Sequence, residues 1–318
     1  FPELFHEAGY HTRLIGKWHL SNFRHPRGFD HWISIPGQGD YYNPQLIFDG
    51  PKRNVPGYTT DLLTDYAIEF VTSPPADQPW MLYLSYKAPH LPYDPPDRYL
   101  EPFKDHTFDL PDTYREDSRD DEPPWLAEMR KAGWSDRHIG PDNIQQTLRG
   151  YHGLVKGIDV NLGRLWQALE QSGQWDNTVI VFIGDNGHML GEHGLFQKMR
   201  MYEPSIRVPL IVRDPRRGAG RVRSEMALNN DVMPTLLDAA GLPIPESVQG
   251  RSLLPLLGDS RPADWREAFL YEHLHTRHLS PMVRGVRTER WKYTEYYVPG
   301  EFVELFDLRN DPDRKSVV

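Results

Sequence analysis

The stretch "TVIVFIGDNGHMLGEHGLFQK", residues 178–198, places an apolar run directly before a dense set of polar groups. The run is typical of a buried β-strand, because Val, Ile and Phe suit a pleated, half-buried surface. The residues that follow it between glycines carry acid, amide, imidazole and ammonium groups: Asp185, Asn186, His188, His193 and Lys198. In open α/β sheets ligands bind beyond the carboxyl ends of the strands, so we expect a functional site here.

Composition narrows the class of protein. The chain has 318 residues, enough for one large α/β domain with a small appendage. A net charge of −9 and a pI near 5.9 argue against a nucleic-acid partner. No apolar stretch approaches the roughly 20 residues of a membrane helix, so we expect a soluble chain without a membrane partner. The absence of Cys excludes disulfides, thiolate metal sites and a cysteine nucleophile within this sequence.

Apolar strand candidates alternate with amphipathic helices, which predicts a parallel sheet covered by helices. The expected strands are residues 12–16, 80–86, 178–184 and 208–213, and the expected helices are 61–71, 142–173 and 231–241. The acidic, Pro-rich segment between His106 and Asn143 lacks a periodic apolar pattern. Such a segment is typical of a loop at the rim of a binding site, here called the lip, or of a disordered insertion. From about residue 266 the composition shifts to Arg, Tyr and Val interspersed with turn residues, which predicts a small antiparallel subdomain.

Three of the expected strands end in polar clusters. Residues 12–16 are followed by Lys17 and His19, residues 80–86 lead to His90, and residues 178–184 lead to Asp185 and its neighbours. Because parallel strands share one carboxyl edge, we expect these groups to line a single crevice.

The residue types in this crevice suit hydrolysis of an anionic ester. Asp185 and Asn186 offer hard oxygen ligands for Ca²⁺, with Mg²⁺ as an alternative. Lys17 and Lys198 could neutralise a tetrahedral oxyanion. His19 and His90 could transfer protons between a nucleophile and a leaving group.

Each feature also has a plainer interpretation. Asp-Asn-Gly after a strand is commonly a turn, and the lysines and His90 could be ordinary surface or structural residues. The pair His188 and His193 does not match the helical zinc motif, so we reject zinc. We interpret the histidines of "EHLHTRH", residues 272–278, as part of a solvated turn, with a substrate contact by one of them as the alternative.

Several longer stretches resemble the type I sulfatase family, whose members belong to the alkaline-phosphatase-like superfamily. "GYHTRLIGKWHLS", starting at Gly9, is similar to the family signature G-Y-x-T-x-x-x-G-K-W-H-L-G, with Ser21 in place of Gly. "GDNGHMLGEHGLFQKMRMYEPSIRVPLIVR" is similar to the metal-binding strand end and the lysine segment after it, and "APHLPY" matches the Pro-His motif. "DVMPTLLDAAGLPIPESVQGRSLLPLL" and "RTERWKYTEYY" match later stretches, so the resemblance covers nearly the whole chain in the family's order.

The resemblance implies a fold and roles for individual residues. The implied fold is an alkaline-phosphatase-like α/β sheet sandwiched by helices, in residues 1–265, and a small C-terminal α+β subdomain with an antiparallel sheet, in residues 266–318. The implied metal ligands of Ca²⁺ are Asp185 and Asn186. Lys17 and His19 would contact a formylglycine nucleophile. Lys198 and His90 would bind the sulfate, and His90 would also protonate the leaving alcohol. His193 is a further candidate for substrate binding.

Two parts of the family pattern are missing from the sequence. Family members form the formylglycine from a C/S-x-P-x-R motif, which does not occur here, and the paired aspartates that the family places upstream of "GYHTRLIGKWHL" are also absent. We therefore expect the sequence to be the downstream part of a sulfatase, inactive by itself, whose nucleophile lies upstream and is matured by a formylglycine-generating enzyme. We also expect the last six residues, "DRKSVV", to be non-native, because they match the translated start of a common sequencing adaptor.

The resemblance leaves the substrate open. Aromatic and arginine-rich segments near the C-terminus favour a sulfated carbohydrate, small or oligomeric. An aryl or alkyl sulfate, a phosphonate or phosphate monoester, and a non-catalytic ligand-binding relative are the alternatives. The sequence also leaves the location open, with a periplasmic or secreted one as an interpretation.

Overall fold

The computed structural model describes residues 1–20, 25–114, 125–126, 143–259, 262–275, 281–297 and 302–311. Its larger part contains the strands β1 (His11–Lys17), β2 (His31–Ile35), β3 (Gln45–Phe48), β4 (Lys52–Asn54), β5 (Trp80–Ser85), β6 (Ile180–Ile183), β7 (Met189–Leu190), β8 (Phe196–Gln197) and β9 (Leu210–Arg213). Its α-helices are α1 (Pro2–Glu7), α2 (Thr59–Thr72), α3 (Asp97–Leu100), α5 (Ile144–Gln171), α6 (Glu203–Ile206) and α7 (Val232–Ala239). No helix within these ranges is both long and apolar enough to cross a membrane.

The main sheet has five strands in the order β4-β3-β2-β1-β5. β1 pairs in parallel with both β2 and β5, whereas β3 and β4 are added antiparallel. The predicted strands 12–16 and 80–86 are therefore neighbours, and their carboxyl ends lie at the same edge. The sequence analysis did not predict β2, β3 or β4. β3 and β4 have only four and three residues, and all three residues of β4 are exposed, so neither has a clear apolar pattern.

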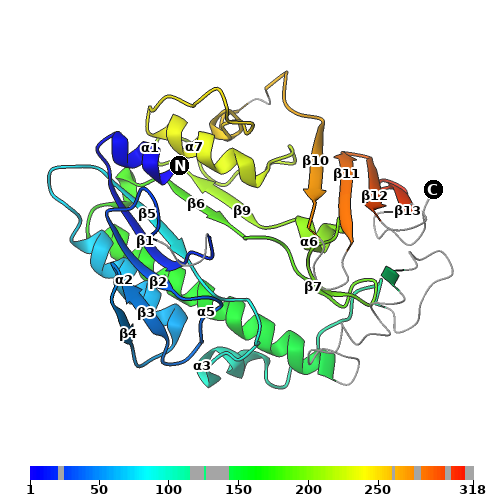
Figure 1. The fold of residues 1–318 in the computed structure, drawn as a ribbon, viewed down its shortest axis with the longest axis horizontal. Helices are drawn as coiled ribbons and strands as arrows, with labels where there is room; N and C mark the ends of the chain where they lie inside the picture. The colour runs from blue at the N-terminus through cyan, green and yellow to red at the C-terminus, as the bar shows by residue number, and fades with distance from the viewer. Residues whose placement is uncertain are drawn as a thin grey trace.

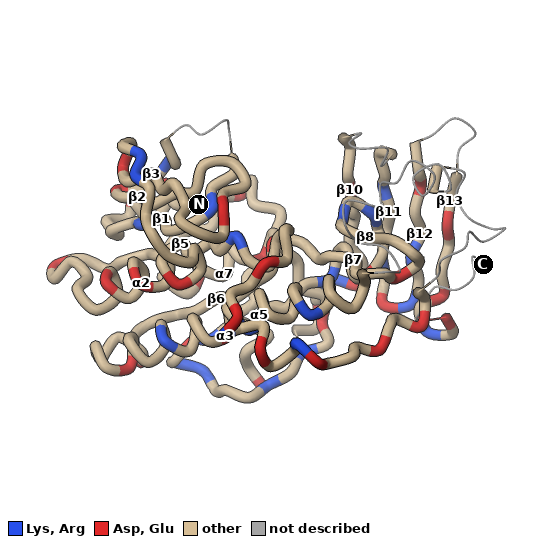
Figure 2. The backbone as a smooth tube through the Cα atoms, turned by 90° about the horizontal axis from the view of Figure 1, so that it is seen from below, with Lys and Arg blue, Asp and Glu red and all other residues tan. Residues whose placement is uncertain are grey.

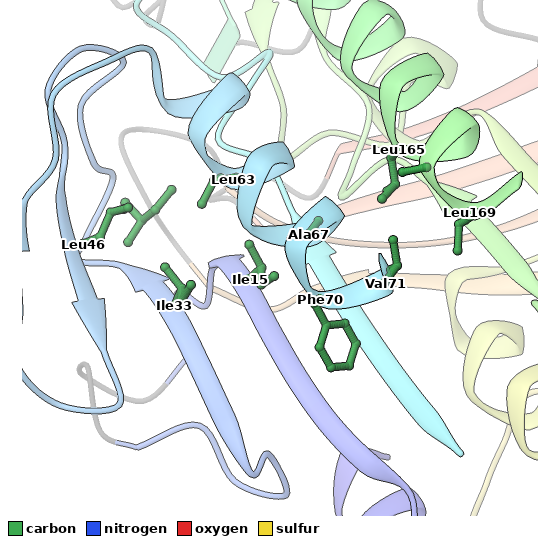
Figure 3. Close-up of a cluster of buried hydrophobic side chains, with 11 residues drawn as sticks. Ile15, Ile33, Leu46, Leu63, Ala67, Phe70, Val71, Leu165 and Leu169 are labelled. Carbon is green, nitrogen blue, oxygen red and sulfur yellow. The ribbon is translucent and has the colours of Figure 1, made fainter. Parts of the chain in front are cut away.

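Helices cover both faces of this sheet, as the sequence predicts (Figure 1). On one face α2 and α5 pack on β1, β2 and β3. Figure 3 shows Leu165 and Leu169 of α5 beside Val71 of α2, in the same cluster as Ile15. On the other face Phe5 of α1 and Leu237 of α7 pack with Leu14 and Met81. The expected helix 142–173 is α5, 28 residues long. Its apolar residues recur every three to four positions, and this spacing gives it a face to bury.

The strand pairing around β6 differs from the sequence prediction. We expected 178–184 and 208–213 to join a parallel sheet, but β6 pairs antiparallel with β9 in a separate two-stranded sheet. The prediction was wrong because no helical crossover separates these strands. Residues 184–209 contain only the short hairpin of β7 and β8 and the single turn of α6, which return the chain beside β6 in the opposite direction.

The C-terminal part is a four-stranded antiparallel sheet, as predicted, in the order β10 (Ala268–His273), β11 (Met282–Thr288), β12 (Trp291–Tyr297) and β13 (Phe302–Asp307). Figure 2 shows it standing beside the larger part, next to β7 and β8. One face packs on that region through Val283, Tyr296 and Phe306 against Met201 and Tyr202.

Some predictions for this half of the chain were wrong or lie outside the described residues. Glu272 and His273 belong to β10, so the interpretation of this segment as a turn was wrong there. The predicted lip falls mostly on residues 115–142, of which only 125 and 126 are described. The "DRKSVV" segment also lies outside the described residues. The boundary between residues 265 and 266 stays a prediction.

Candidate active site

Lys17 is the last residue of β1, the strand between β2 and β5. Its Nζ donates a hydrogen bond to Oε1 of Gln38, 2.7 Å away, in the loop after β2. The pKa of Lys17 is lowered by burial and then by the charge of Lys198, while Asp185 acts in the opposite direction. Groups from three separate strand ends therefore share one electrostatic neighbourhood. His19, two residues on, is exposed and has a φ of 32°.

His90 follows β5 and is anchored by backbone carbonyls. Its Nδ1 lies 2.9 Å from the carbonyl oxygen of Leu91, and its own carbonyl accepts a 2.5 Å hydrogen bond from the Tyr41 hydroxyl. Because a carbonyl can only accept, the proton of the neutral ring sits on Nδ1 and leaves Nε2 as the free nitrogen. Burial lowers the pKa of His90, and the charges of Lys17, Lys87 and Lys198 lower it further against the raising effect of the Leu91 hydrogen bond.

Asp185 and Asn186 follow β6 and are both exposed. Asn186 has a φ of 119°, and its Nδ2 donates to the carbonyl oxygen of Gly187 at 2.5 Å. The amide nitrogen is thus engaged, and Oδ1 is the atom left to bind a cation. Burial raises the pKa of Tyr83 on β5, and the Asp185 carboxylate adds to the rise. Asp185 therefore lies near both β1 and β5.

Lys198 follows β8 in a loop with unusual backbone geometry. Its neighbours Gln197 and Met199 have φ values of 73° and 75°, a region that residues other than Gly seldom adopt. The buried Arg200 guanidinium donates to the carbonyl oxygens of Phe196 and Lys198 at 3.2 and 3.0 Å. These hydrogen bonds tie the loop to the protein interior and so hold Lys198 in place.

Lys17 is electrostatically coupled to Lys198 and Asp185, and His90 to Lys17 and Lys198, so the structure brings these four groups near one another. That they line a single crevice stays a prediction. His193 is 6% exposed, and its ring centroid lies 4.7 Å from that of Tyr202. Its contact with substrate stays a prediction.

Three functional candidates were missed by sequence reasoning: Gln38, Lys87 and Tyr93. Tyr93 lies 2.6 Å from Nε2 of His188, whose pKa is lowered to about 4 by burial and by the charges of Lys198 and His90. The contacts of these candidates join residues far apart in the chain: Tyr93 contacts His188, and Gln38 accepts hydrogen bonds from Lys17 and Lys87. No local sequence signal could have indicated them.

The donors present fit a hard divalent cation only in part. Asp185 and Asn186 provide a carboxylate and an amide oxygen side by side, and such oxygens suit Ca²⁺. Ca²⁺ takes roughly six to eight oxygens. Across the described ranges no group of three or more His, Cys, Asp or Glu side chains is placed to hold a metal ion. These two residues would hold the cation only together with further ligands.

Comparison with known proteins identifies the family. Residues 1–242 match the sequence profile of the sulfatase family. The chain belongs to the sulfatase family. In this sulfatase, residues 191–318 also match a profile described as N-sulphoglucosamine sulphohydrolase, C-terminal. By family the protein is a hydrolase of sulfate esters with an alkaline-phosphatase-like fold.

Individual relatives agree with this assignment. The N-acetylglucosamine-6-O-sulfatase of Bacteroides thetaiotaomicron is 34% identical, over 98% of this sulfatase and 67% of that protein. An arylsulfatase of Clostridium perfringens is 30% identical, over 97% of this chain and 71% of its own. A structure solved in complex with its substrate D-glucosamine-2-N,6-O-disulfate superposes with a TM-score of 0.85 at 33% identity, covering 98% of this chain and 76% of the other.

Proposed function

We propose that this sulfatase removes sulfate from a sulfated carbohydrate, and that glucosamine derivatives carrying a 6-O-sulfate are its substrates. The observation that carries the proposal is the convergence of Lys17, His90 and Lys198 beside Asp185 at one edge of the fold. The N-acetylglucosamine-6-O-sulfatase relative and the neighbour solved with a sulfated glucosamine support the choice of sugar.

The proposed roles follow from charge and hydrogen bonding. Lys198 and His90 bind the sulfate oxygens, and the charges of Lys17 and Lys198 offset the charge that develops on those oxygens in the transition state. A bound sulfate ester brings negative charge between these lysines and His90, and this charge raises the pKa of the imidazole. Nε2 can then carry a proton and give it to the leaving alcohol, while Nδ1 stays bound to the Leu91 carbonyl.

We assign Asp185 and Asn186 as two ligands of a Ca²⁺ ion, or of Mg²⁺ in its place. The ion would supply further positive charge next to the sulfate. His19 would lie beside the nucleophile together with Lys17. A formylglycine, produced by a formylglycine-generating enzyme, is the nucleophile we propose.

We place that nucleophile on a segment that this sequence does not contain. The 318 residues include neither Cys nor a Ser-x-Pro-x-Arg motif. Among the described strands β5 pairs only with β1, and β6 pairs only with β9, so each has an edge to which a further strand could be added. We further propose a periplasmic or secreted location, supported by a 30% identical extracellular sulfatase of Drosophila melanogaster.

A second candidate is hydrolysis of a phosphonate or phosphate monoester. The phosphonate monoester hydrolase of Silicibacter pomeroyi superposes with a TM-score of 0.74 at 26% identity, over 98% of this chain and 74% of the other. Sulfate and phosphonate esters are both tetrahedral oxyanions, and two lysines and a histidine suit either.

The test measures turnover of N-acetylglucosamine-6-sulfate, p-nitrophenyl sulfate and p-nitrophenyl phenylphosphonate with added Ca²⁺. It compares this chain with a longer form that includes the nucleophile motif and has been matured. We expect the longer form alone to turn over, with the sugar sulfate preferred. Preference for the phosphonate would favour the second candidate, and binding without turnover by the longer form would favour a ligand-binding relative.

Variants of the longer form test the roles. Lys198→Ala and His90→Ala should lower kcat by about 100-fold or more, because transition-state charge stabilisation and proton transfer are lost. Lys104→Ala removes a surface lysine paired with Glu101 and serves as the matched control. Turnover near normal in either site variant would remove that residue from the mechanism.

A further inference from the structure

Gln38 connects two lysines of different strands. Its side-chain Oε1 accepts a hydrogen bond from Lys17 Nζ at 2.7 Å, and its backbone oxygen accepts one from Lys87 Nζ at 3.1 Å. The residue sits in a tight turn closed by a 3.1 Å hydrogen bond from the Gly39 amide to the Pro36 carbonyl. The turn therefore presents two acceptors to two ammonium groups at once.

Lys87 continues the connection toward His90. Its Nζ also lies 3.3 Å from the Leu91 carbonyl oxygen, the same atom that accepts from Nδ1 of His90. Leu91 thus joins the buried lysine to the imidazole. The hydrogen bonds run without a break from Lys17 through Gln38, Lys87 and Leu91 to His90.

Burying the ammonium group of Lys87 at this position is energetically unfavourable. Lys87 is 4% exposed, its ammonium donates hydrogen bonds to two neutral carbonyls, and that ammonium lies 4.8 Å from the centre of the Tyr41 ring. Burial is the main cause that lowers its pKa to about 8, and the charge of Lys17 adds to the effect. A methionine of similar length would fill the same volume at lower cost, so packing alone does not explain a lysine here.

We propose that Lys87 and the turn residue Gln38 are positioning residues, which hold Lys17 and His90 at a set separation for the reaction. The inference rests on the proposed function, because it needs those two residues to act on the substrate. Gln38 orients the Lys17 ammonium toward the sulfate. Lys87 fixes the Leu91 carbonyl, and this carbonyl keeps the His90 proton on Nδ1 and Nε2 toward the leaving group.

Lys87 also sets the charge around His90. The charged and titratable groups that act on this imidazole are Lys17, Lys87 and Lys198, and His188 is coupled to it as well. Lys87 lowers the pKa of His90, so its removal should raise that pKa. A residue that only packs in the core would not change the titration of the imidazole.

The experiment measures kcat, KM and the pH–rate profile of the matured longer form with N-acetylglucosamine-6-sulfate. Lys87→Met and Gln38→Ala should each lower kcat by about tenfold with little change in KM, because misplaced groups lose transition-state contacts. Lys87→Met should also move the His90 limb of the profile to higher pH, and Lys87→Arg should move it back. Gln38 is exposed, so its variant tests the same connection should Lys87→Met fail to fold.

The matched control is Lys292→Met, which removes another buried lysine, 1% exposed and packed over the rings of Tyr202 and Phe306 in the C-terminal part. It should leave the pH profile unchanged. The inference is overturned if Lys87→Met and Gln38→Ala keep a normal kcat and an unchanged pH–rate profile. This outcome counts against it when Lys17→Ala and His90→Ala lose activity in the same assay. Where Lys17→Ala and His90→Ala are themselves active, the proposed roles fail first and the positioning role with them.

Discussion

Replacing Gly16 with Ala should separate β1 from β5 and displace Lys17, the next residue. Gly16 has a φ of +115°, and it pairs with Ser34 on one side and Ser85 on the other. A Cβ built at this position would lie 1.9 Å from the Ser85 carbonyl oxygen and 2.7 Å from its carbon. Both atoms belong to the backbone of a paired strand, so no side-chain rotation can relieve the overlap.

The size of the effect follows from these distances. Ordinary Cβ contacts begin at 3.4 Å, so the two strands must move apart by about 1.5 Å. The unfavourable φ costs about 1–3 kcal/mol. Overpacking costs about 1–3 kcal/mol more. We expect the free energy of unfolding to fall by about 4 kcal/mol. A shift of about 1 Å at Lys17 should lower kcat/KM by about 100-fold.

Urea unfolding of this chain measures the stability, and turnover by the matured longer form measures the activity. Gly50→Ala is the matched control, because Gly50 has a similar φ of +124° but nothing within 4 Å of the added Cβ. It should lose only the backbone term, about 1–3 kcal/mol, and keep normal kcat/KM. Equal destabilisation by both substitutions, or normal kcat/KM in Gly16→Ala, would refute the argument from strand separation.

Three further outcomes are expected. The pKa of Lys87 is lowered to about 8 in the folded chain from its usual value of 10.5, so between these pH values the unfolded chain binds more protons than the folded one. The free energy of unfolding should therefore rise with pH in this range. Urea unfolding from pH 7 to 10 should show a smaller rise in Lys87→Met. Asp231 is fully buried and bound by Arg266 and the amide of Arg251, so Asp231→Ala should lower the free energy of unfolding by about 3–5 kcal/mol in the same assay. Added Ca²⁺ should raise the melting temperature of the matured longer form but not of this chain, and Asp185→Ala should abolish the shift in a thermal scan.

The sequence predicted most of what depends on local pattern. The helix expected at 142–173 is α5, because its apolar periodicity by itself defines a face to bury. The strands at 12–16 and 80–86 were predicted from their apolar runs, and the antiparallel C-terminal sheet from Arg, Tyr and Val residues interspersed with turn residues. Polar residues directly after apolar strands also indicated the candidate site. Their spacing along the chain places Lys17, His90 and Asp185 at strand ends whatever the details of packing.

Long-range pairing was decided only by the tertiary structure. β6 and β9 carry apolar patterns that suit either strand direction, and only the path of residues 184–209 makes them antiparallel. The hydrogen bonds that link Lys17 to His90 likewise depend on Gln38, a loop residue whose sequence neighbours indicate a turn and nothing more. The composition and periodicity of a segment determine which face it buries. Which distant backbone carbonyl meets an ammonium group depends on how the whole sheet and its loops pack together.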